Sequence, residues 1–276
     1  MKLAVYSLIT PDYRVQEAAE LIAEIGYDGV EWTVDYTNAM WDGESNWHID
    51  TGNLEESAQA ARDAADSCGL EVTGLGTRCN CFDLDGVRTC MKVAQIVGAP
   101  AIRVAAPGYD GSTPFPELFD RARDAYAEIQ TVAADHGVKA AIETHNGLIS
   151  PSASAARRLL EELDPVWTGV LHDSGNMARE GMENWKMGIE MLAPYIAEVH
   201  VKDLAWFRDD GEWHCDLTPL GEGMVDWPAV VGALREVGYD GYLTDENFLP
   251  GWCQVSEELP TRQLLEQDYR FLRSLL

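Results

Sequence analysis

The segment Gly26-Tyr27-Asp28-Gly29 (GYDG) lies near the N-terminus, and the same four residues recur near the C-terminus as Gly238-Tyr239-Asp240-Gly241. In both copies the first glycine follows a run of helical periodicity, which is typical of a glycine that ends a helix. The second glycine opens a short apolar run of the kind found in buried strands. One type of helix-to-strand turn is thus used at both ends of the chain, which predicts a repeated strand–helix architecture.

Short apolar runs of strand type occur eight times, each followed by a helical pattern. They are rich in Val, Ile, Leu and Ala without clean alternation, as in parallel strands covered on both faces. The predicted strands span residues 2–7, 29–33, 71–75, 101–105, 138–143, 168–173, 197–201 and 242–246. Eight such units predict one domain, residues 1–276, folded as an α/β protein of the (β/α)8 TIM barrel type. A doubly wound open sheet is the alternative, but no G-x-G-x-x-G pattern follows the first strand.

Charged side chains stand at the C-terminal ends of the last four predicted strands. The fifth strand ends in Glu143, the sixth in Asp173 and the eighth in Glu246, while the seventh exposes His200. In a closed barrel these strand ends meet at the rim that carries the active site. Three converging carboxylates repel one another unless a cation lies between them. Three oxygen ligands and an imidazole suit a divalent metal, Mn2+ first, with Co2+, Mg2+ or Zn2+ as alternatives.

The motifs around these residues resemble the xylose isomerase-like barrels. This family contains sugar isomerases, epimerases and inosose-processing enzymes, and it includes relatives of endonuclease IV. The resemblance spans nearly the whole chain. Its most specific motifs are Ile142-Glu143-Thr144-His145, Asp173-Ser174-Gly175-Asn176, His200-Val201-Lys202-Asp203 and Leu220-Gly221-Glu222-Gly223. The resemblance implies that Glu143, Asp173, His200 and Glu246 are metal ligands, and that Glu143 and Glu246 exchange the substrate proton.

The implied reaction removes a proton beside the carbonyl of a keto-sugar or keto-polyol. A Lewis-acidic metal stabilises the enediolate, and return of the proton gives isomerisation or epimerisation. Elimination is the alternative outcome in the resembled family. Inosose dehydratases catalyse it, as do the large subunits of C-glycoside deglycosidases, which act on 3-keto C-glucosides. An endonuclease IV-like DNA-repair enzyme is a remote alternative, because it needs several zinc ions and the chain has six histidines. A non-catalytic sugar-binding barrel is a further alternative.

Two positions depart from the sugar epimerases of this family. Those enzymes commonly place a substrate-contacting His three residues after the aspartate that matches Asp173, and here Asn176 occupies that position. They often place a second substrate-binding Glu where this chain has Ile149. Ketose 3-epimerisation therefore has weaker support than the general reaction class, and Asn176 becomes a predicted substrate-binding residue.

His145 and Lys202 are additional candidates for catalytic residues. His145 lies two residues beyond Glu143, so strand periodicity points both side chains the same way. It is either a general base or acid beside the metal, or a rim residue bonded to backbone. Lys202 lies two residues past His200 and either contacts a substrate oxygen or forms a salt bridge at the rim.

Tryptophans are concentrated on segments expected at the barrel mouth. Six of the nine lie there: Trp32, Trp41, Trp47, Trp206, Trp213 and Trp252. Flat indole faces suit the C–H surface of a sugar or an aromatic substituent. We therefore predict Trp32 and Trp206 as substrate-binding residues, together with Glu222 of the last motif. The alternative is that these tryptophans are packing residues or a subunit contact.

The net charge of −27 argues against nucleic acid as a partner, because the protein's field repels polyphosphates. No apolar run approaches the roughly 18 residues that span a bilayer. The N-terminus lacks the pattern of a signal peptide, so we expect a cytoplasmic protein without a membrane partner. The expected partner is a small-molecule carbohydrate. We also expect a homo-oligomer, or a hetero-oligomer with a small subunit if the protein is a C-glycoside deglycosidase.

Overall fold

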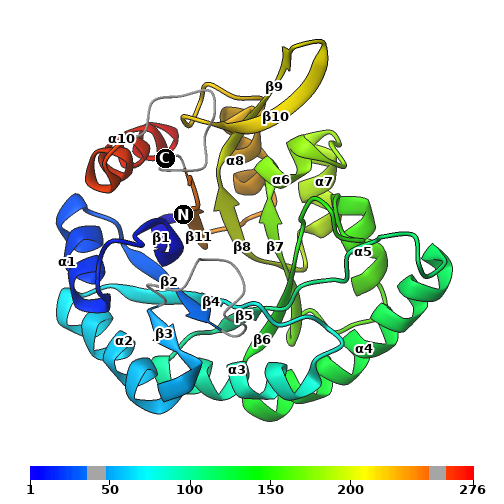
Figure 1. The fold of residues 1–276 in the computed structure, drawn as a ribbon, viewed down its shortest axis with the longest axis horizontal. Helices are drawn as coiled ribbons and strands as arrows, with labels where there is room; N and C mark the ends of the chain where they lie inside the picture. The colour runs from blue at the N-terminus through cyan, green and yellow to red at the C-terminus, as the bar shows by residue number, and fades with distance from the viewer. Residues whose placement is uncertain (36–47, 249–258) are drawn as a thin grey trace.

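Eight parallel strands form a closed barrel in this computed structural model, which describes residues 1–35, 48–248 and 259–276 (Figure 1). The barrel strands are β1 (Lys2–Tyr6), β2 (Gly29–Asp35), β4 (Glu71–Gly76), β5 (Ala101–Arg103), β6 (Lys139–Glu143), β7 (Thr168–Asp173), β8 (Ile196–Val201) and β11 (Tyr242–Asp245). They follow one another around the ring as β1, β11, β8, β7, β6, β5, β4 and β2, and pairing of β1 with β2 closes it. The predicted TIM barrel is confirmed, and every predicted strand lies within two residues of an observed one.

Helices surround the strand ring (Figure 1). They are α1 (Val15–Ile25), α2 (Leu54–Cys68), α3 (Leu84–Val97), α4 (Phe115–His136), α5 (Ala153–Leu160), α6 (Ser174–Arg179), α7 (Trp185–Leu192), α8 (Trp227–Glu236) and α10 (Thr261–Leu275), with short 3-10 turns η1 (Ser7–Ile9) and η2 (Thr51–Asn53). In both GYDG segments the first glycine has positive φ, 112° at Gly26 and 79° at Gly238. A residue with a Cβ rarely adopts that conformation, which explains glycine at both helix ends.

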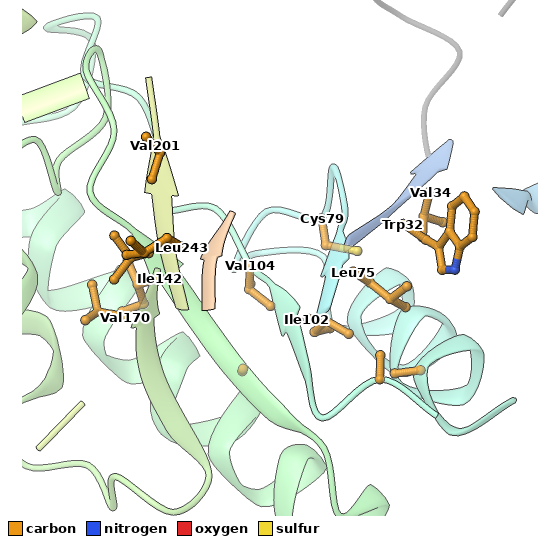
Figure 2. Packing of buried hydrophobic residues seen from close by; sticks show 14 of the residues in the cluster. Trp32, Val34, Leu75, Cys79, Ile102, Val104, Ile142, Val170, Val201 and Leu243 are labelled. Atoms are coloured by element: carbon orange, nitrogen blue, oxygen red, sulfur yellow. The ribbon is translucent and has the colours of Figure 1, made fainter. Parts of the chain in front are cut away.

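The main hydrophobic core includes the outward faces of the strands and the helices packed on them. Figure 2 shows part of it, with Leu75, Ile102, Ile142 and Val170 among the packed side chains. Because side chains alternate along a strand, the neighbours of these residues point into the barrel. Toward the C-terminal ends of the strands those inward positions are polar, and this polar interior forms the candidate site.

An antiparallel hairpin stands at the rim after β8, and the sequence analysis did not predict it. Its strands are β9 (Asp203–Asp209) and β10 (Glu212–Thr218), paired along their full length. Asp210 and Gly211 both have positive φ, as a two-residue type I′ turn requires. The Asp-Gly pair was the available sequence signal. The hairpin projects at the upper edge of Figure 1. A further short strand, β3 (Ile49–Asp50), pairs with the end of β2.

Candidate active site

The structure brings together the four side chains predicted as metal ligands. Glu143 ends β6, Asp173 ends β7, His200 lies in β8 and Glu246 follows β11. Each offers a ligand atom, and these atoms all lie within 4.8 Å of one another. All four residues are buried. Closure of the barrel, with neighbouring strands in register, therefore produces a compact set of donors from distant parts of the chain.

His200 is held from both sides of its ring. Its Nδ1 atom lies 2.9 Å from Oε2 of Glu246 and 3.8 Å from Oε1 of Glu143. Its Nε2 atom lies 2.6 Å from Oε2 of Glu31, a residue of β2 that the sequence analysis missed. The ring of Tyr6 stacks on the imidazole with 5.5 Å between centroids. The Nδ1 edge of His200 thus faces Glu143 and Glu246, and the Nε2 edge faces Glu31.

Two buried cations contact the carboxylates of this cluster. The Nζ atom of Lys202 lies 2.6 Å from Oδ2 of Asp173 and 2.5 Å from Oε2 of Glu246. Arg103, at the end of β5, forms an ion pair with Glu143. Four buried carboxylates belong to this cluster, those of Glu31, Glu143, Asp173 and Glu246. With all four ionised and His200 neutral, as metal binding requires, Arg103 and Lys202 leave two negative charges unbalanced. A divalent cation would neutralise them, so the cluster suits such an ion in charge as well as in donor type.

The pKa values reflect the balance between burial and these neighbours. Burial alone would raise the pKa of Glu143, but the charge of Arg103 and the nearby His200 hold it well below its usual range. Burial is likewise outweighed at Glu246, whose pKa falls to about 2 beside His200 and Lys202. At Asp173 burial prevails and raises the pKa to about 7. Two of the three carboxyl groups are thus strongly held in the charged form.

Asn176 bridges two of the carboxylates. Its Nδ2 atom lies 2.7 Å from Oδ2 of Asp173 and 3.2 Å from Oε1 of Glu143. Its backbone N–H donates to Oδ1 of Asp173, which caps helix α6. Gly175 leaves room for Lys202, which follows β8, because a Cβ at position 175 would come within 2.6 Å of the Lys202 side chain. The Asp173-Ser174-Gly175-Asn176 motif therefore orients the carboxylates, and Asn176 also lines the cavity.

His145 faces the same cavity as Glu143, from the loop that follows β6. Its Nδ1 atom lies 2.6 Å from the carbonyl oxygen of Asn146, so Nδ1 carries the proton and donates it. The lone pair of the neutral ring is then on Nε2, which has no hydrogen-bond partner among the described residues. Burial lowers the pKa of His145, which favours the neutral ring. The side chain both bonds backbone and keeps one nitrogen available.

A cavity of about 750 Å³ opens above the cluster. Its floor is polar, with Glu143, His200, Lys202 and Glu246. Its outer part is lined by the β9–β10 hairpin, which contributes Trp206, Phe207, Trp213, His214, Cys215, Asp216 and Leu217. The volume falls within the range of about 300–1,000 Å³ that is typical of small-molecule sites. Charged groups at one end and aromatic groups at the other thus meet in one cavity.

Two predicted substrate-binding residues, Trp32 and Glu222, are not among the residues that line this cavity. The burial of Trp32 corrects that prediction, whereas the role of Glu222 stays a prediction. Trp32 is fully buried in the hydrophobic core, where Figure 2 shows it beside Val34. Glu31 points into the barrel, and strand alternation therefore turns Trp32 outward. Glu222 is exposed on the loop between β10 and α8. The motif around it wraps Asp203, whose carboxylate accepts the Gly221 and Val225 N–H groups.

The other tryptophans predicted at the barrel mouth fall into two groups. Trp206 and Trp213 line the cavity from the hairpin. Trp41, Trp47 and Trp252 lie outside the described residues. Glu31 and Arg103 were missed, although each is a charged residue within an apolar strand, the same signal that marked Glu143.

Residues 19–275 match the model of the xylose isomerase-like TIM barrel family. The chain belongs to this family. It is 26% identical over 257 residues to the L-ribulose-5-phosphate 3-epimerase UlaE of Shigella flexneri, covering 88% of this chain and 84% of the relative. It is 22% identical over 254 residues to an uncharacterized protein of Methanocaldococcus jannaschii, covering 90% of this chain and 84% of the relative.

Solved structures of this family share the fold. The 3-keto-D-glucoside 4-epimerase YcjR of E. coli superposes with a TM-score of 0.75 at 19% identity, covering 99% of both chains. The IOLI protein, determined with a bound zinc atom, superposes with a TM-score of 0.76 at 15% identity, covering 100% of this chain and 98% of the other. No helix among the described residues has the length and apolar character needed to cross a bilayer.

Proposed function

We propose that this protein is a divalent-metal-dependent enzyme that moves a proton beside the carbonyl of a keto-sugar or keto-polyol, giving epimerisation or isomerisation. The observation that carries the proposal is the buried cluster of Glu143, Asp173, His200 and Glu246, of which Glu143, His200 and Glu246 line the cavity. The relationship to an L-ribulose-5-phosphate 3-epimerase supports the same reaction class.

The four clustered residues would hold the metal. Three carboxylates and one imidazole favour Mn2+, with Co2+, Mg2+ and Zn2+ as alternatives. When bound, the cation supplies Lewis-acid stabilisation of negative charge on a substrate oxygen. The positively charged side chains of Arg103 and Lys202 also line the cavity, where their N–H groups can donate hydrogen bonds to substrate oxygens.

The hydrogen bonds favour Glu246 and His145 as the pair that removes and returns the proton. Both oxygens of Glu143 are engaged, Oε2 by Arg103 and Oε1 by Asn176, which suits a ligand better than a base. Oε1 of Glu246 accepts no hydrogen bond from any residue that the structure describes, and Nε2 of His145 is equally available. Two proton-transfer groups beside one cavity are what an epimerisation requires.

Proton NMR in D2O tests this proposal. Purified protein would be loaded with Mg2+ as a diamagnetic metal and given a panel of keto-sugars, inososes and 3-keto glycosides. Deuterium that enters the carbon beside the carbonyl with the skeleton retained would support an epimerase or isomerase. His145→Ala should slow this exchange, whereas His136→Ala, at the far end of α4 and in contact with Gln95, serves as the matched control. Absence of exchange with every keto substrate would contradict the proposal.

A lyase acting on a larger substrate is the second candidate. The outer cavity is lined by aromatic residues, and Trp213 among them is 66% exposed. A cavity of about 750 Å³ exceeds what one hexose needs, so a 3-keto glucoside with a second ring would fit. Elimination from such a C-glucoside, or loss of water from an inosose, would begin with the same proton abstraction. In the NMR experiment, release of an aglycone or of water would identify this reaction.

A further inference from the structure

Glu31 contacts the Nε2 edge of His200, while Glu143 and Glu246 lie at the Nδ1 edge. The Oε2 atom of Glu31 is 2.6 Å from Nε2 of His200, and each of these two side chains is 1% exposed. The strands β1 and β11 separate β2 from β8 in the ring, so Glu31 reaches His200 through the barrel interior. This contact is thus a product of barrel closure and links the first half of the barrel to the second.

The surroundings of Glu31 keep it in this position. Tyr6 is its partner in the β1–β2 register, and the Tyr6 ring stacks on His200. Glu198 also points into the interior, but its carboxylate accepts hydrogen bonds from Thr73, at 2.8 Å, and from Thr244. Two buried glutamates therefore lie near each other, and it is Glu31 that hydrogen-bonds the imidazole.

The two nitrogens of an imidazole point in different directions, so only one of them can bind a given metal ion. A histidine that binds a metal nearly always donates its other ring N–H to a carboxylate, a carbonyl or water, and this bond sets the tautomer and the ring orientation. In His200 the Nδ1 atom faces Glu143 and Glu246, while Nε2 faces Glu31.

We propose that Glu31 is a positioning residue that accepts the Nε2–H of His200 and thereby presents the Nδ1 lone pair to the metal. This inference rests on the proposed metal centre. Loss of such a carboxylate typically weakens metal binding by about 10–100-fold. Glu31→Gln keeps an acceptor for the Nε2–H of His200, whereas Glu31→Leu leaves that buried donor unpaired, so only the Leu variant should destabilise the metal-free fold.

The variants Glu31→Gln and Glu31→Leu test the role, with Glu198→Gln as the matched control. Glu198→Gln removes the same charge from the same barrel interior without removing a hydrogen bond to His200. The dissociation constant for Mn2+ would be measured by competition with a chromophoric chelator. We expect it to rise about tenfold in Glu31→Gln and about a hundredfold in Glu31→Leu, and by less than about threefold in Glu198→Gln.

Two further measurements separate positioning from a general structural role. Long-range 1H–15N spectra of histidine-labelled, Zn2+-loaded protein should show a protonated Nε2 on His200, and that signature should be lost or shifted in both Glu31 variants. Metal-free Glu31→Gln should melt close to the wild type, whereas Glu31→Leu should melt lower because it leaves a buried N–H donor unpaired. Unchanged Mn2+ affinity in both Glu31 variants, or an equal loss in Glu198→Gln, would overturn the inference. Failure of the wild type to bind Mn2+ at all would instead refute the proposed metal centre.

Discussion

Replacing Lys202 by Met should tighten metal binding. The ammonium lies 2.6 Å from Asp173 and 2.5 Å from Glu246, so it contacts two of the oxygens that would bind a metal. A hydrogen bond to a charged group contributes about 1.5–3 kcal/mol net, so displacing two of them costs about 3–6 kcal/mol. Water and a substrate oxygen recover part of that cost. We expect the free energy of metal binding to become more favourable by at least about 1.4 kcal/mol in Lys202→Met, which lowers the Kd tenfold.

The assay is calorimetric titration of metal-free protein with Mn2+ at neutral pH. Lys139→Met is the matched control, because Lys139 opens β6 at the opposite end of the strand from Glu143 and carries the same charge. Its affinity should stay within about twofold of the wild type, since the effect of a distant charge is screened. Turnover by Lys202→Met should fall despite the tighter metal, because the same side chain is proposed to bind substrate. Equal or weaker Mn2+ binding by Lys202→Met would refute the competition between ammonium and metal.

Four other substitutions test the candidate site and the stability of the fold. Glu143→Gln and His200→Ala should abolish Mn2+ binding and turnover with an unchanged far-UV spectrum, and wild-type turnover in either would remove the proposed metal site. His145→Ala should slow deuterium exchange by about 10²–10⁴-fold if it transfers the proton, whereas an unaltered rate would assign it a structural role. Burial lowers the pKa of His48 to about 4. In the unfolded chain the pKa of a histidine is about 6.5, so the unfolded state binds the proton at a higher pH than the folded state does. The free energy of unfolding should therefore fall as the pH drops from about 6.5 to 4, by up to about 1.4 kcal/mol per pH unit. Denaturant unfolding of His48→Phe should show a shallower loss over that window, and an unchanged slope would contradict the assignment.

Local sequence pattern was sufficient to predict the barrel and the residues at its rim. Strand periodicity and helix-ending glycines depend on neighbours in sequence, so the eight strands were predicted to within two residues. Since parallel strands in a barrel all end at one rim, the residues ending β6, β7 and β11 could be placed together without coordinates. The Asp-Gly signal of the β9–β10 hairpin is equally local, and it was overlooked in the prediction.

The sequence by itself determined the fold and four side chains of the candidate site, and the tertiary structure decided which charges those side chains meet. Glu31 and Trp32 are adjacent, and only the closed barrel shows that Glu31 points inward to His200 while Trp32 points outward to the core. The contact of Arg103 with Glu143 likewise depends on how β5 and β6 pair. Hydrogen bonds and ion pairs between distant strands depend on register and side-chain direction, and neither is encoded in the period of a single strand.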